Sequence, residues 1–190
     1  ASHQFRTPLS TILSSTGLIE QYIKNFQPLQ IERHVDRVRS SVKSLIQLLD
    51  DFLSLDKLEQ GQVKSEKRVF DLYNFIREIT DSLDSSLKDG QDIYYSYTGS
   101  KVVGTEPNML NNILLNLLSN AIKYSESEIT LEVEANAQTI TISIMDKGIG
   151  IPEEELRKLF SKHFRASNVG TIKGTGLGLN IVQHYVRLLN

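Results

Sequence analysis

The sequence contains no cysteine and no tryptophan. Without cysteine the chain cannot form disulfides or thiolate metal sites, which fits a reducing compartment. Its 21 basic and 23 acidic residues leave a net charge of −2, so no excess of positive charge points to nucleic acid or an anionic membrane as partner. No apolar run approaches the roughly 18 residues that span a membrane, and no signal-like segment is visible. We therefore expect a cytoplasmic fragment, and any membrane anchor of a full-length protein would lie outside these residues.

Two long helical patterns occupy residues 1–61. Apolar residues recur at alternating steps of four and three from Phe5 to Phe26, with Thr16 as the one exception, and again from Ile31 to Phe52. Pro28 separates the two runs, which predicts an antiparallel helical hairpin. Two helices cannot cover this much apolar surface by themselves. We therefore expect a second copy of the chain to complete a four-helix bundle, giving a homodimer.

His3 stands near the start of the first helical pattern. It lies about 160° around the helix from the apolar seam, which predicts that it faces solvent. Thr7 lies one turn further on the same side, and Pro8 inside the helix removes a hydrogen bond and bends the axis. An exposed histidine beside a threonine usually has no function, so these residues alone leave a plain surface and a reactive histidine both open.

Residues 62–190 follow a different pattern, which predicts a second domain. Strands are predicted where β-branched and aromatic residues gather or apolar and polar residues alternate, and a helix is predicted where apolar residues return every three or four positions. The expected elements are strands at 69–72, 92–98, 101–103, 129–133 and 140–144, and a helix at 72–87. The fold class is therefore α+β: a helical hairpin followed by an α/β sandwich.

The segment 106–125 predicts an amphipathic helix with an unusual polar strip. At about 100° per residue, Asn112, Asn116, Asn120 and Lys123 fall side by side next to the apolar face. An amide oxygen can ligate Mg²⁺, and a lysine one turn along can meet the phosphates that such an ion bridges. The alternative, an ordinary polar helix face, stays open on this segment alone.

A carboxylate followed by spaced glycines ends the strand at 140–144. Asp146 could accept a hydrogen bond from a ligand's amino group, while Gly148 and Gly150 let the backbone approach closely. A turn with a solvated aspartate is the equally open alternative. Pro152, followed by three glutamates, predicts the start of another helix.

A second glycine segment, 174–178, runs directly into a helix predicted at 179–189. Glycines before a helix N-terminus expose amide groups to an anion, which is a common way to seat phosphate. No lysine and hydroxyl pair follows the glycines, so this is not a Walker A loop, and the dinucleotide GxGxxG spacing is absent.

In this order, the segments resemble the sensor histidine kinases of two-component signalling. SHQFRTPL resembles the family's phospho-acceptor box, NILLNLLSNAIKYS the asparagine box, DKGIGIP the first glycine box, LFSKHFR the phenylalanine box and GTGLGLNIV the second glycine box. The resemblance covers nearly the whole chain, and five boxes in one order are highly specific.

The resemblance implies a dimerisation and histidine phosphotransfer domain at 1–61 and a Bergerat-type ATP-binding domain at 62–190. The implied function is autophosphorylation of His3 from ATP with Mg²⁺, then transfer of the phosphoryl group to an aspartate of a response regulator. Thr7 matches a position associated with dephosphorylating the regulator. By position, the implied metal ligands are Asn116 and Asn120, and the implied nucleotide contacts are Asn116, Asn120, Lys123, Tyr124, Asp146, Gly148, Gly150, Arg165, Gly174, Thr175, Gly176, Leu177 and Gly178.

Two departures from the family pattern bear on these expectations. Gln4 stands where the family commonly has a carboxylate that takes the imidazole proton, and an amide can orient the ring but cannot act as that base. The family usually continues past Asn190 with two more strands, so C-terminal strands are expected to be missing. Alternatives are a dimeric scaffold that docks a response regulator with little catalysis, favoured only by Gln4, and another Bergerat-type ATPase such as the gyrase group, which leaves His3 unexplained.

Overall fold

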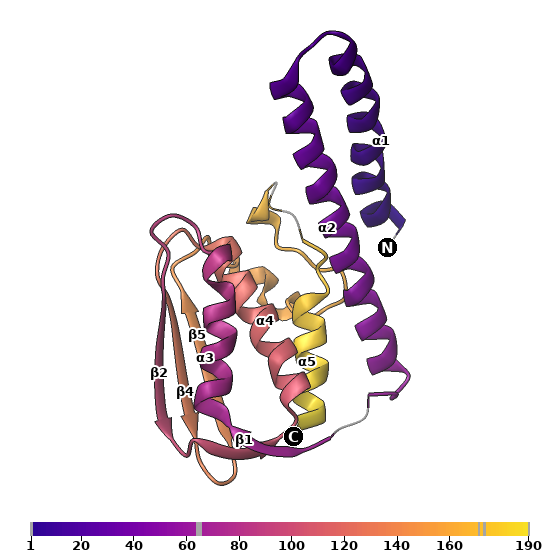
Figure 1. The fold of residues 1–190 in the computed structure, drawn as a ribbon. Helices are drawn as coiled ribbons and strands as arrows, with labels where there is room; N and C mark the ends of the chain where they lie inside the picture. Colours follow the sequence, from indigo (N-terminus) through magenta and orange to yellow (C-terminus); the bar gives the residue numbers. More distant parts are fainter. Residues whose placement is uncertain (1, 64–65, 171, 173, 190) are drawn as a thin grey trace. The chain divides into compact units, whose positions relative to one another are not determined.

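The structure, a computed structural model, describes residues 2–63, 66–170, 172 and 174–189, and for Ser2 and His3 it describes the backbone only. The chain forms two compact units, Ala1–Gln60 and Gly61–Asn190 (Figure 1). Within the part of the chain that is described, no helix is both long and apolar enough to cross a membrane.

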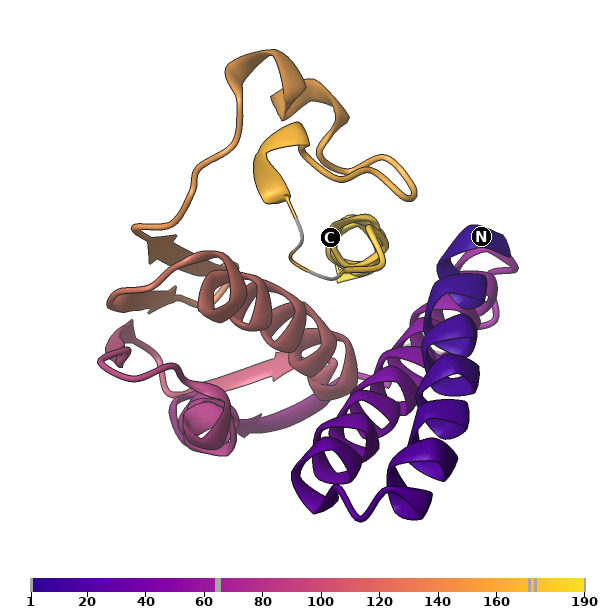
Figure 2. The ribbon, with the colours of Figure 1, turned by 90° about the horizontal axis from the view of Figure 1, so that it is seen from above.

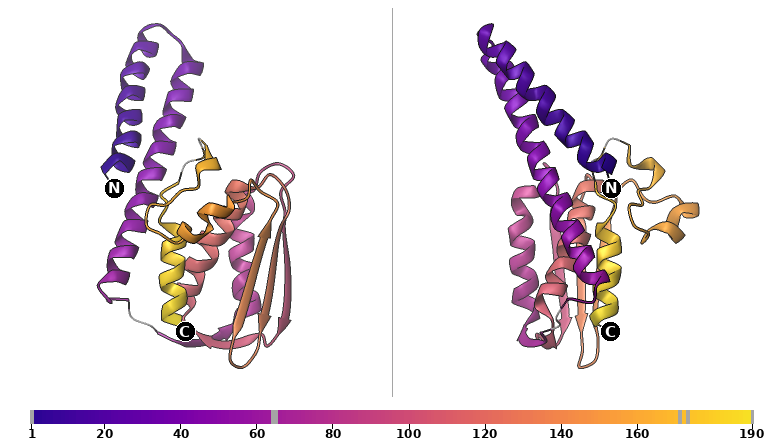
Figure 3. Two further views of the ribbon diagram at one scale, coloured as in Figure 1. Left: turned by 180° about the vertical axis from the view of Figure 1, so that it is seen from behind. Right: turned by 90° about the vertical axis from the view of Figure 1, so that its right-hand side faces the viewer.

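The first unit is an antiparallel helical hairpin. Helix α1 (Ser2–Lys24) and helix α2 (Pro28–Glu59) run side by side (Figures 1 and 3), and α2 has Pro28 in its first turn, where a missing N–H costs nothing. Between the two helices, the ring of Tyr22 stacks on the buried His34 at 5.5 Å. The α1 helix continues through Pro8.

The hairpin leaves many apolar side chains exposed. Phe26 is 91% exposed and Leu29 is 74% exposed, which is a much larger exposure than an apolar side chain has in a protein core. Other large exposed side chains of this unit are Leu9, Leu13, Ile23, Val35, Val42, Ile46, Leu49, Phe52 and Leu53. A single hairpin therefore does not bury the apolar positions of the predicted seams.

The second unit is an α/β sandwich built on a three-stranded sheet. The strand order is β2 (Ile93–Gly99), β4 (Ile129–Ala135), β5 (Ile140–Asp146), with β2 parallel and β5 antiparallel to β4. A separate antiparallel pair joins β1 (Arg68–Asp71) to β3 (Val102–Thr105). The helices are α3 (Leu72–Leu83), α4 (Pro107–Tyr124) and α5 (Gly178–Leu189), with short 3₁₀ turns at η1 (Asp84–Ser86), η2 (Glu153–Lys158) and η3 (Ser167–Val169).

The core lies between one face of the sheet and the helices. Alternate residues of β4 point inward, so Ile129, Leu131 and Val133 are buried while the intervening glutamates are exposed. These side chains belong to one apolar cluster with Leu114 and Leu118 of α4 and with residues of α3. Figures 2 and 3 show α3, α4 and α5 on one side of the sheet, and the residues that point to the other face are mostly polar and exposed.

Two predicted helices differ from the structure. The helix expected at 72–87 ends at Leu83, because Asp84 and the serines that follow favour turns, and these residues form η1. The helix expected after Pro152 is only the 3₁₀ segment η2. Leu156 within η2 and Phe160 just after it stay 47% and 41% exposed, and a short helix without a well-packed face is not stable in water.

Candidate functional site

Helix α4 forms one wall of the candidate site, and its start is firmly fixed. The buried carboxylate of Glu106 caps the helix by accepting hydrogen bonds from the backbone amides of Asn108 (3.3 Å) and Met109 (2.5 Å). Its apolar face is buried in the core through residues such as Leu114. With the apolar face held in the core, the asparagine strip lies beside that face, and Asn112, Asn116 and Asn120 are half-buried.

The asparagine side chains of α4 bond back along the helix. Asn112 donates from its amide nitrogen to the carbonyl of Asn108 (2.8 Å), and Asn116 donates in the same way to the carbonyl of Asn112 (2.9 Å). Each bond fixes the nitrogen side of the amide and leaves the oxygen Oδ1 directed elsewhere. The Oδ1 of Asn116 lies 2.5 Å from the position a Cβ would take on Gly178, so the second glycine segment meets α4 here.

The first glycine segment joins the end of α4. The amide of Ile149 donates to the carbonyl of Tyr124 (3.1 Å), and the amide of Gly148 donates to Oδ1 of Asp146 (2.8 Å). A Cβ on Gly148 would collide with the Tyr124 carbonyl and lie 2.6 Å from the Asp146 carboxylate. Gly150 has φ +66°, a conformation that other residues adopt only with strain. Both glycines are therefore required by the local backbone.

The second glycine segment passes close to the basic end of α4. A Cβ on Gly174 would lie 2.7 Å from Nζ of Lys123 and 3.5 Å from the Tyr124 hydroxyl. Thr175 accepts a hydrogen bond from the amide of Leu177 (3.2 Å), and Leu177 is buried, which anchors the segment where α5 begins. The ammonium of Lys123, which also lies 4.9 Å from the centre of the Tyr124 ring, thus faces glycine backbone near a helix N-terminus. This arrangement can hold an anion.

Residues 151–170, which follow the first glycine segment, loop out from the sheet (Figure 2). Asn168 of η3 donates to the carbonyls of Ile149 (3.2 Å) and Gly150 (3.0 Å), and Asn180 of α5 donates to the carbonyl of Phe160 (2.8 Å). Gly176, with φ +67°, lies against the backbone of residues 163–164. The loop is thus bonded to the first glycine segment and to α5, and its backbone lies against the second glycine segment at Gly176.

The structure places the predicted site residues in three groups. Asn116, Asn120, Lys123 and Tyr124 lie along the second half of α4, and the two glycine segments meet that half through the contacts described above. Arg165 lies on the loop, where its guanidinium donates to the carbonyl of Ile172. His3, Gln4 and Thr7 lie on α1 in the other unit, and the side chain of His3 is outside the described residues.

The donor set of α4 fits a hard cation. Amide oxygens are ligands that Mg²⁺ accepts, and Mg²⁺ usually keeps several waters and binds substrate phosphates as well. No group of three or more histidines, aspartates or glutamates within the described residues could hold a metal by itself. A metal here would therefore depend on the amides of α4 together with the phosphates of a ligand.

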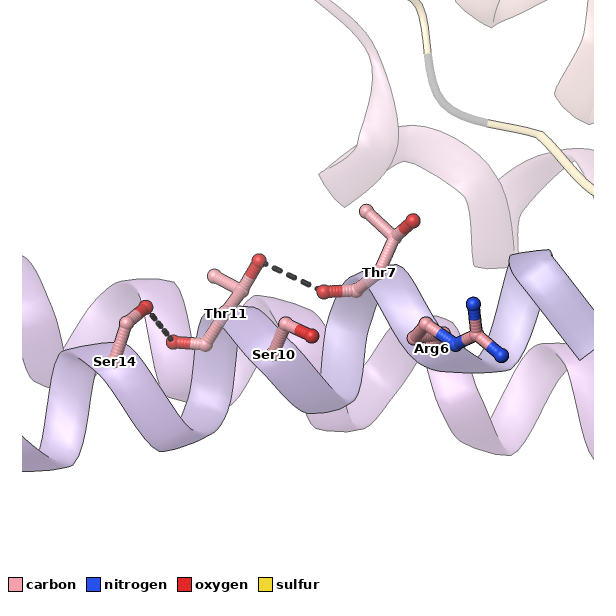
Figure 4. Close-up of a pocket in the computed structure, with 5 residues that line it drawn as sticks. All are labelled: Arg6, Thr7, Ser10, Thr11 and Ser14. Atoms are coloured by element: carbon pink, nitrogen blue, oxygen red, sulfur yellow. Dashed lines mark hydrogen bonds between the residues drawn. The ribbon is translucent and has the colours of Figure 1, made fainter.

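A row of hydroxyl groups lines a shallow depression on α1, after the first turn. Arg6, Thr7, Ser10, Thr11 and Ser14 form its surface (Figure 4). Thr11 donates to the carbonyl of Thr7 (3.1 Å) and Ser14 to that of Thr11 (3.2 Å). Gln4 is half-buried and Thr7 is exposed.

Sequence reasoning missed three residues that support α4. Glu106 caps its start, and Lys88 and Gln91 donate to the carbonyls at its end. A glutamate and a proline directly before an apolar run, here Glu106 and Pro107, are a helix-start signal that could have identified Glu106 as the cap. No local signal identifies the other two, because their acceptors lie more than 30 residues away along the chain.

Two family models match this chain. Residues 105–190 match the family described as "Histidine kinase-, DNA gyrase B-, and HSP90-like ATPase", and residues 1–61 match the "His Kinase A (phospho-acceptor) domain". The first match contains α4 and both glycine segments, and the second coincides with the helical hairpin.

Curated relatives match over nearly the full length of the chain. The hybrid signal transduction protein dokA of Dictyostelium discoideum is 32% identical over 202 residues, which is 99% of this chain and 12% of that protein. The sensor histidine kinase RcsC of Escherichia coli K12 is 31% identical over 198 residues, which is 100% of this chain and 20% of that protein. The chain thus spans a fifth or less of these two relatives.

Solved histidine kinases share the fold. The histidine kinase AdeS of Acinetobacter baumannii has a TM-score of 0.68 at 20% identity, covering 97% of this chain and 86% of its own. The histidine kinase ThkA in complex with the response regulator TrrA gives 0.68 at 22% identity, covering 86% and 48%, and full-length ShkA in complex with AMPPNP gives 0.66 at 22%, covering 98% and 39%. With the matched hairpin, the matched ATPase domain and these relatives, the chain belongs to the sensor histidine kinases.

Proposed function

We propose that this chain is the catalytic core of an ATP-dependent protein histidine kinase, which phosphorylates itself on His3 and passes the phosphoryl group to a response regulator. One observation carries the proposal: both glycine segments meet the second half of α4, where Asn116, Lys123 and Tyr124 lie. An amide ligand, a cation and close backbone are the groups that phosphoryl transfer needs, because its catalysis is mainly positioning and charge neutralisation.

In this proposal the two glycine segments bind opposite ends of ATP. One oxygen of Asp146 accepts from Gly148, and the other would accept from the adenine amino group, with Gly148 and Gly150 leaving space for the base. Lys123 and Tyr124 would face the phosphates. Residues 174–178, Gly174, Thr175, Gly176, Leu177 and Gly178, would close over the nucleotide, and Arg165 would reach it from the loop after leaving the Ile172 carbonyl.

Asn116 and Asn120 would hold Mg²⁺ through their side-chain oxygens. When bound, the ion would neutralise charge on the phosphates of ATP. The contribution of the chain is to aim these oxygens, and the hydrogen bond from Asn116 to the Asn112 carbonyl supports that orientation. No carboxylate cluster would be needed for such a site, because the phosphates of ATP would supply further oxygen ligands.

The transfer step forms one bond and breaks one. An imidazole nitrogen of His3 would attack the γ-phosphorus, forming N–P while the bond to the bridging oxygen breaks and its electron pair leaves with ADP. The imidazole proton would pass to water, since Gln4 can orient the ring but cannot accept that proton. An aspartate oxygen of the response regulator would then attack the same phosphorus and release the histidine.

The partners follow from this chemistry. A receiver domain would dock on α1 near His3, and the solved ThkA forms a complex with the response regulator TrrA. The exposed apolar residues of the hairpin would be covered by a second copy of the chain. ATP and receiver domains are cytoplasmic, so we place this part of the protein in the cytoplasm. Thr7, exposed one turn after His3, would position a water for dephosphorylating the regulator as a second activity.

The proposal is tested by incubating the chain with Mg²⁺ and ATP labelled on either the γ- or the α-phosphorus. Phosphohistidine formation would be supported if the γ-phosphorus label stays with the protein, survives treatment with alkali and is released by acid. α-Labelled ATP is the control, since adenylation would retain it. Full-rate release of phosphate without any phosphoprotein would instead favour an ATPase of the gyrase type.

The main alternative is a dimeric scaffold that docks a regulator without useful catalysis, and Gln4 is the residue that favours it. Replacing Gln4 by glutamate supplies the carboxylate base that the family commonly has. A phosphorylation rate that rises in Gln4→Glu from a measurable parent rate supports a working kinase. A chain that binds ATP but gives no phosphoprotein with either residue supports the scaffold.

A further inference from the structure

The loop between η1 and β2 reaches the C-terminal end of α4. The ammonium of Lys88 donates to the carbonyls of Lys123 (3.1 Å) and Ser125 (2.7 Å). The amide nitrogen of Gln91 donates to the carbonyls of Ile122 (3.2 Å) and Ser125 (2.9 Å). Two side chains more than 30 residues distant in sequence thus satisfy three backbone carbonyls at the end of one helix.

Such donors meet a physical need. The last carbonyls of a helix have no partner inside the helix, and many helices end in a glycine that bends the chain back to supply one. Here the C-cap is Ser125 in an extended conformation (φ −107°, ψ 157°), so the donors must come from elsewhere. The positive charge of Lys88 also complements the negative end of the helix dipole.

The two donors form one unit. Oε1 of Gln91 accepts a hydrogen bond from the backbone amide of Lys88 (3.0 Å), so both ends of the Gln91 amide are used. Gln91 is only 5% exposed. Lys88 also pairs with the carboxylate of Glu126 (2.6 Å), which lies just past the helix. A side chain this buried and fully bonded holds its partners with little freedom to shift.

The remaining carbonyl in this stretch belongs to the candidate site. Between Lys123 and Ser125, the carbonyl of Tyr124 accepts from the amide of Ile149 in the first glycine segment (3.1 Å). All four carbonyls from 122 to 125 therefore have a donor. Gln91 donates to 122, Lys88 to 123 and the Ile149 amide to 124, while Lys88 and Gln91 both donate to 125. Lys123 and Tyr124 belong to this same stretch, so the loop that carries Lys88 and Gln91 fixes the backbone from which their side chains extend.

We infer that Lys88 and Gln91 are positioning residues of the nucleotide site: they hold the end of α4 so that Lys123, Tyr124 and the first glycine segment keep one mutual arrangement. This inference rests on the proposed ATP site. Neither residue is expected to touch the nucleotide. Their loss should weaken binding because the phosphate-facing and base-facing parts of the site no longer share a fixed backbone.

The test compares Lys88→Met with Lys88→Arg. Methionine keeps the length of the side chain and removes the charge and the donors, whereas arginine keeps both. By calorimetry with Mg-ATP on the full chain, we expect the Kd to rise about tenfold in Lys88→Met, the size expected for losing a charged hydrogen bond, and to stay within about twofold in Lys88→Arg. Gln91→Met is the second variant, with an expected rise in the same direction.

A matched control separates positioning from general destabilisation. Asp71 caps the start of α3 by accepting from the Asn74 amide (2.9 Å), so Asp71→Ala removes a helix cap that belongs to another helix. It should lower the melting temperature without changing the Kd for Mg-ATP. A rise in Kd in Asp71→Ala equal to that in Lys88→Met would overturn the inference.

The backbone amide of Ile149 gives a direct readout. In nitrogen-15 NMR spectra without nucleotide, the chemical shift of this amide proton should differ from the parent's in Lys88→Met and Gln91→Met and match it in Lys88→Arg. The reason is that its acceptor, the Tyr124 carbonyl, lies between the carbonyls that Lys88 and Gln91 hold. An unmoved Ile149 amide with an unchanged Kd in both variants would overturn the inference. A parent chain that binds no Mg-ATP would instead overturn the proposed function on which the inference rests.

Discussion

The side-chain oxygen of Asn116 points at the backbone of Gly178, 2.5 Å from where a Cβ would be. One residue lies in the middle of α4 and the other begins α5, so the contact brings the second glycine segment onto the asparagine strip. Any side chain at position 178 must displace the Asn116 amide. The requirement for glycine at this position is therefore imposed by a proposed metal ligand rather than by the backbone.

Gly178→Ala should consequently weaken nucleotide binding without unfolding the domain. The φ of Gly178 is not in the left-handed region, and alanine favours a helix by up to about 1 kcal/mol over glycine. The added methyl group would be accommodated by turning the Asn116 side chain, which removes its oxygen from the proposed metal site. We expect the Kd for Mg-ATP to rise about tenfold, while the melting temperature changes by no more than about 4 °C.

Gly17→Ala is the matched control for that substitution. Gly17 lies inside α1, where nothing lies within 4 Å of a Cβ, so alanine there should leave Mg-ATP binding unchanged. A Gly178→Ala variant that binds Mg-ATP as tightly as the parent would show that the Asn116 orientation is not needed.

Asn116→Ala should abolish Mg-ATP binding in calorimetry and leave the dimer intact. The reason is the loss of an oxygen ligand at a proposed site that depends on few protein ligands, since the described residues contain no group of three or more histidines, aspartates or glutamates that could hold a metal. Asn112→Ala is a close control: it removes an amide one turn earlier but keeps the backbone carbonyl that Asn116 uses (2.9 Å). Equal losses in the two variants would contradict a specific role for Asn116.

The apolar face of the hairpin predicts a dimer in solution. Leu49 and Phe52 of α2 are 49% and 48% exposed and continue the predicted seam. In sedimentation, Leu49→Lys should shift the chain from dimer toward monomer, because a charge in a packed interface is costly. Ser40→Lys adds the same charge at an exposed position off the seam and should leave the dimer unchanged. A parent that sediments as a monomer at micromolar concentration would refute this prediction.

The fold should lose stability at alkaline pH because of Tyr95 in β2. Burial, followed by the neighbouring Tyr97, Tyr73 and Asp71, raises the pKa of Tyr95. Because the folded pKa lies above the unfolded value, this contribution to stability is fully present below about pH 10 and is lost as the pH rises above that value toward the folded pKa.

The measurement is urea unfolding of the parent and of Tyr95→Phe at several pH values between about 9 and about 11. The free energy of unfolding should fall more steeply with pH in the parent, since phenylalanine has no proton to lose. Phenylalanine also removes the weak hydrogen bond from the Tyr95 hydroxyl to the Tyr73 carbonyl (3.4 Å), which is a small offset at every pH. If the free energy of unfolding falls equally with pH in the parent and in Tyr95→Phe, then Tyr95 has the same pKa in the folded and unfolded states, which would contradict the prediction.

Much of the fold follows from local patterns in the sequence. The steps of four and three predict α1 and α2, and the alternation along 129–133 and 140–144 predicts the β4–β5 hairpin with one buried face. Both patterns work because burial on one side of a helix or strand repeats with the period of that element. The asparagine strip of α4 is visible for the same reason.

Other features depend on contacts between distant residues, which no local pattern records. The parallel pairing of β2 with β4 joins segments separated by α4, and the donors Lys88 and Gln91 find their acceptors only after folding. The wrong prediction of a full helix after Pro152 has a related cause: local helix-start signals are present, but Leu156 stays 47% exposed and gains too little packing to stabilise the helix.

The most direct test of the account asks which atom receives the phosphate. The chain has four histidines, so the γ-labelled, alkali-stable phosphoprotein should be digested and its phosphopeptide identified by mass spectrometry. The account predicts phosphate on His3 alone, lost in His3→Gln and retained in His163→Gln. Phosphate on another residue, or undiminished labelling of His3→Gln, would contradict it.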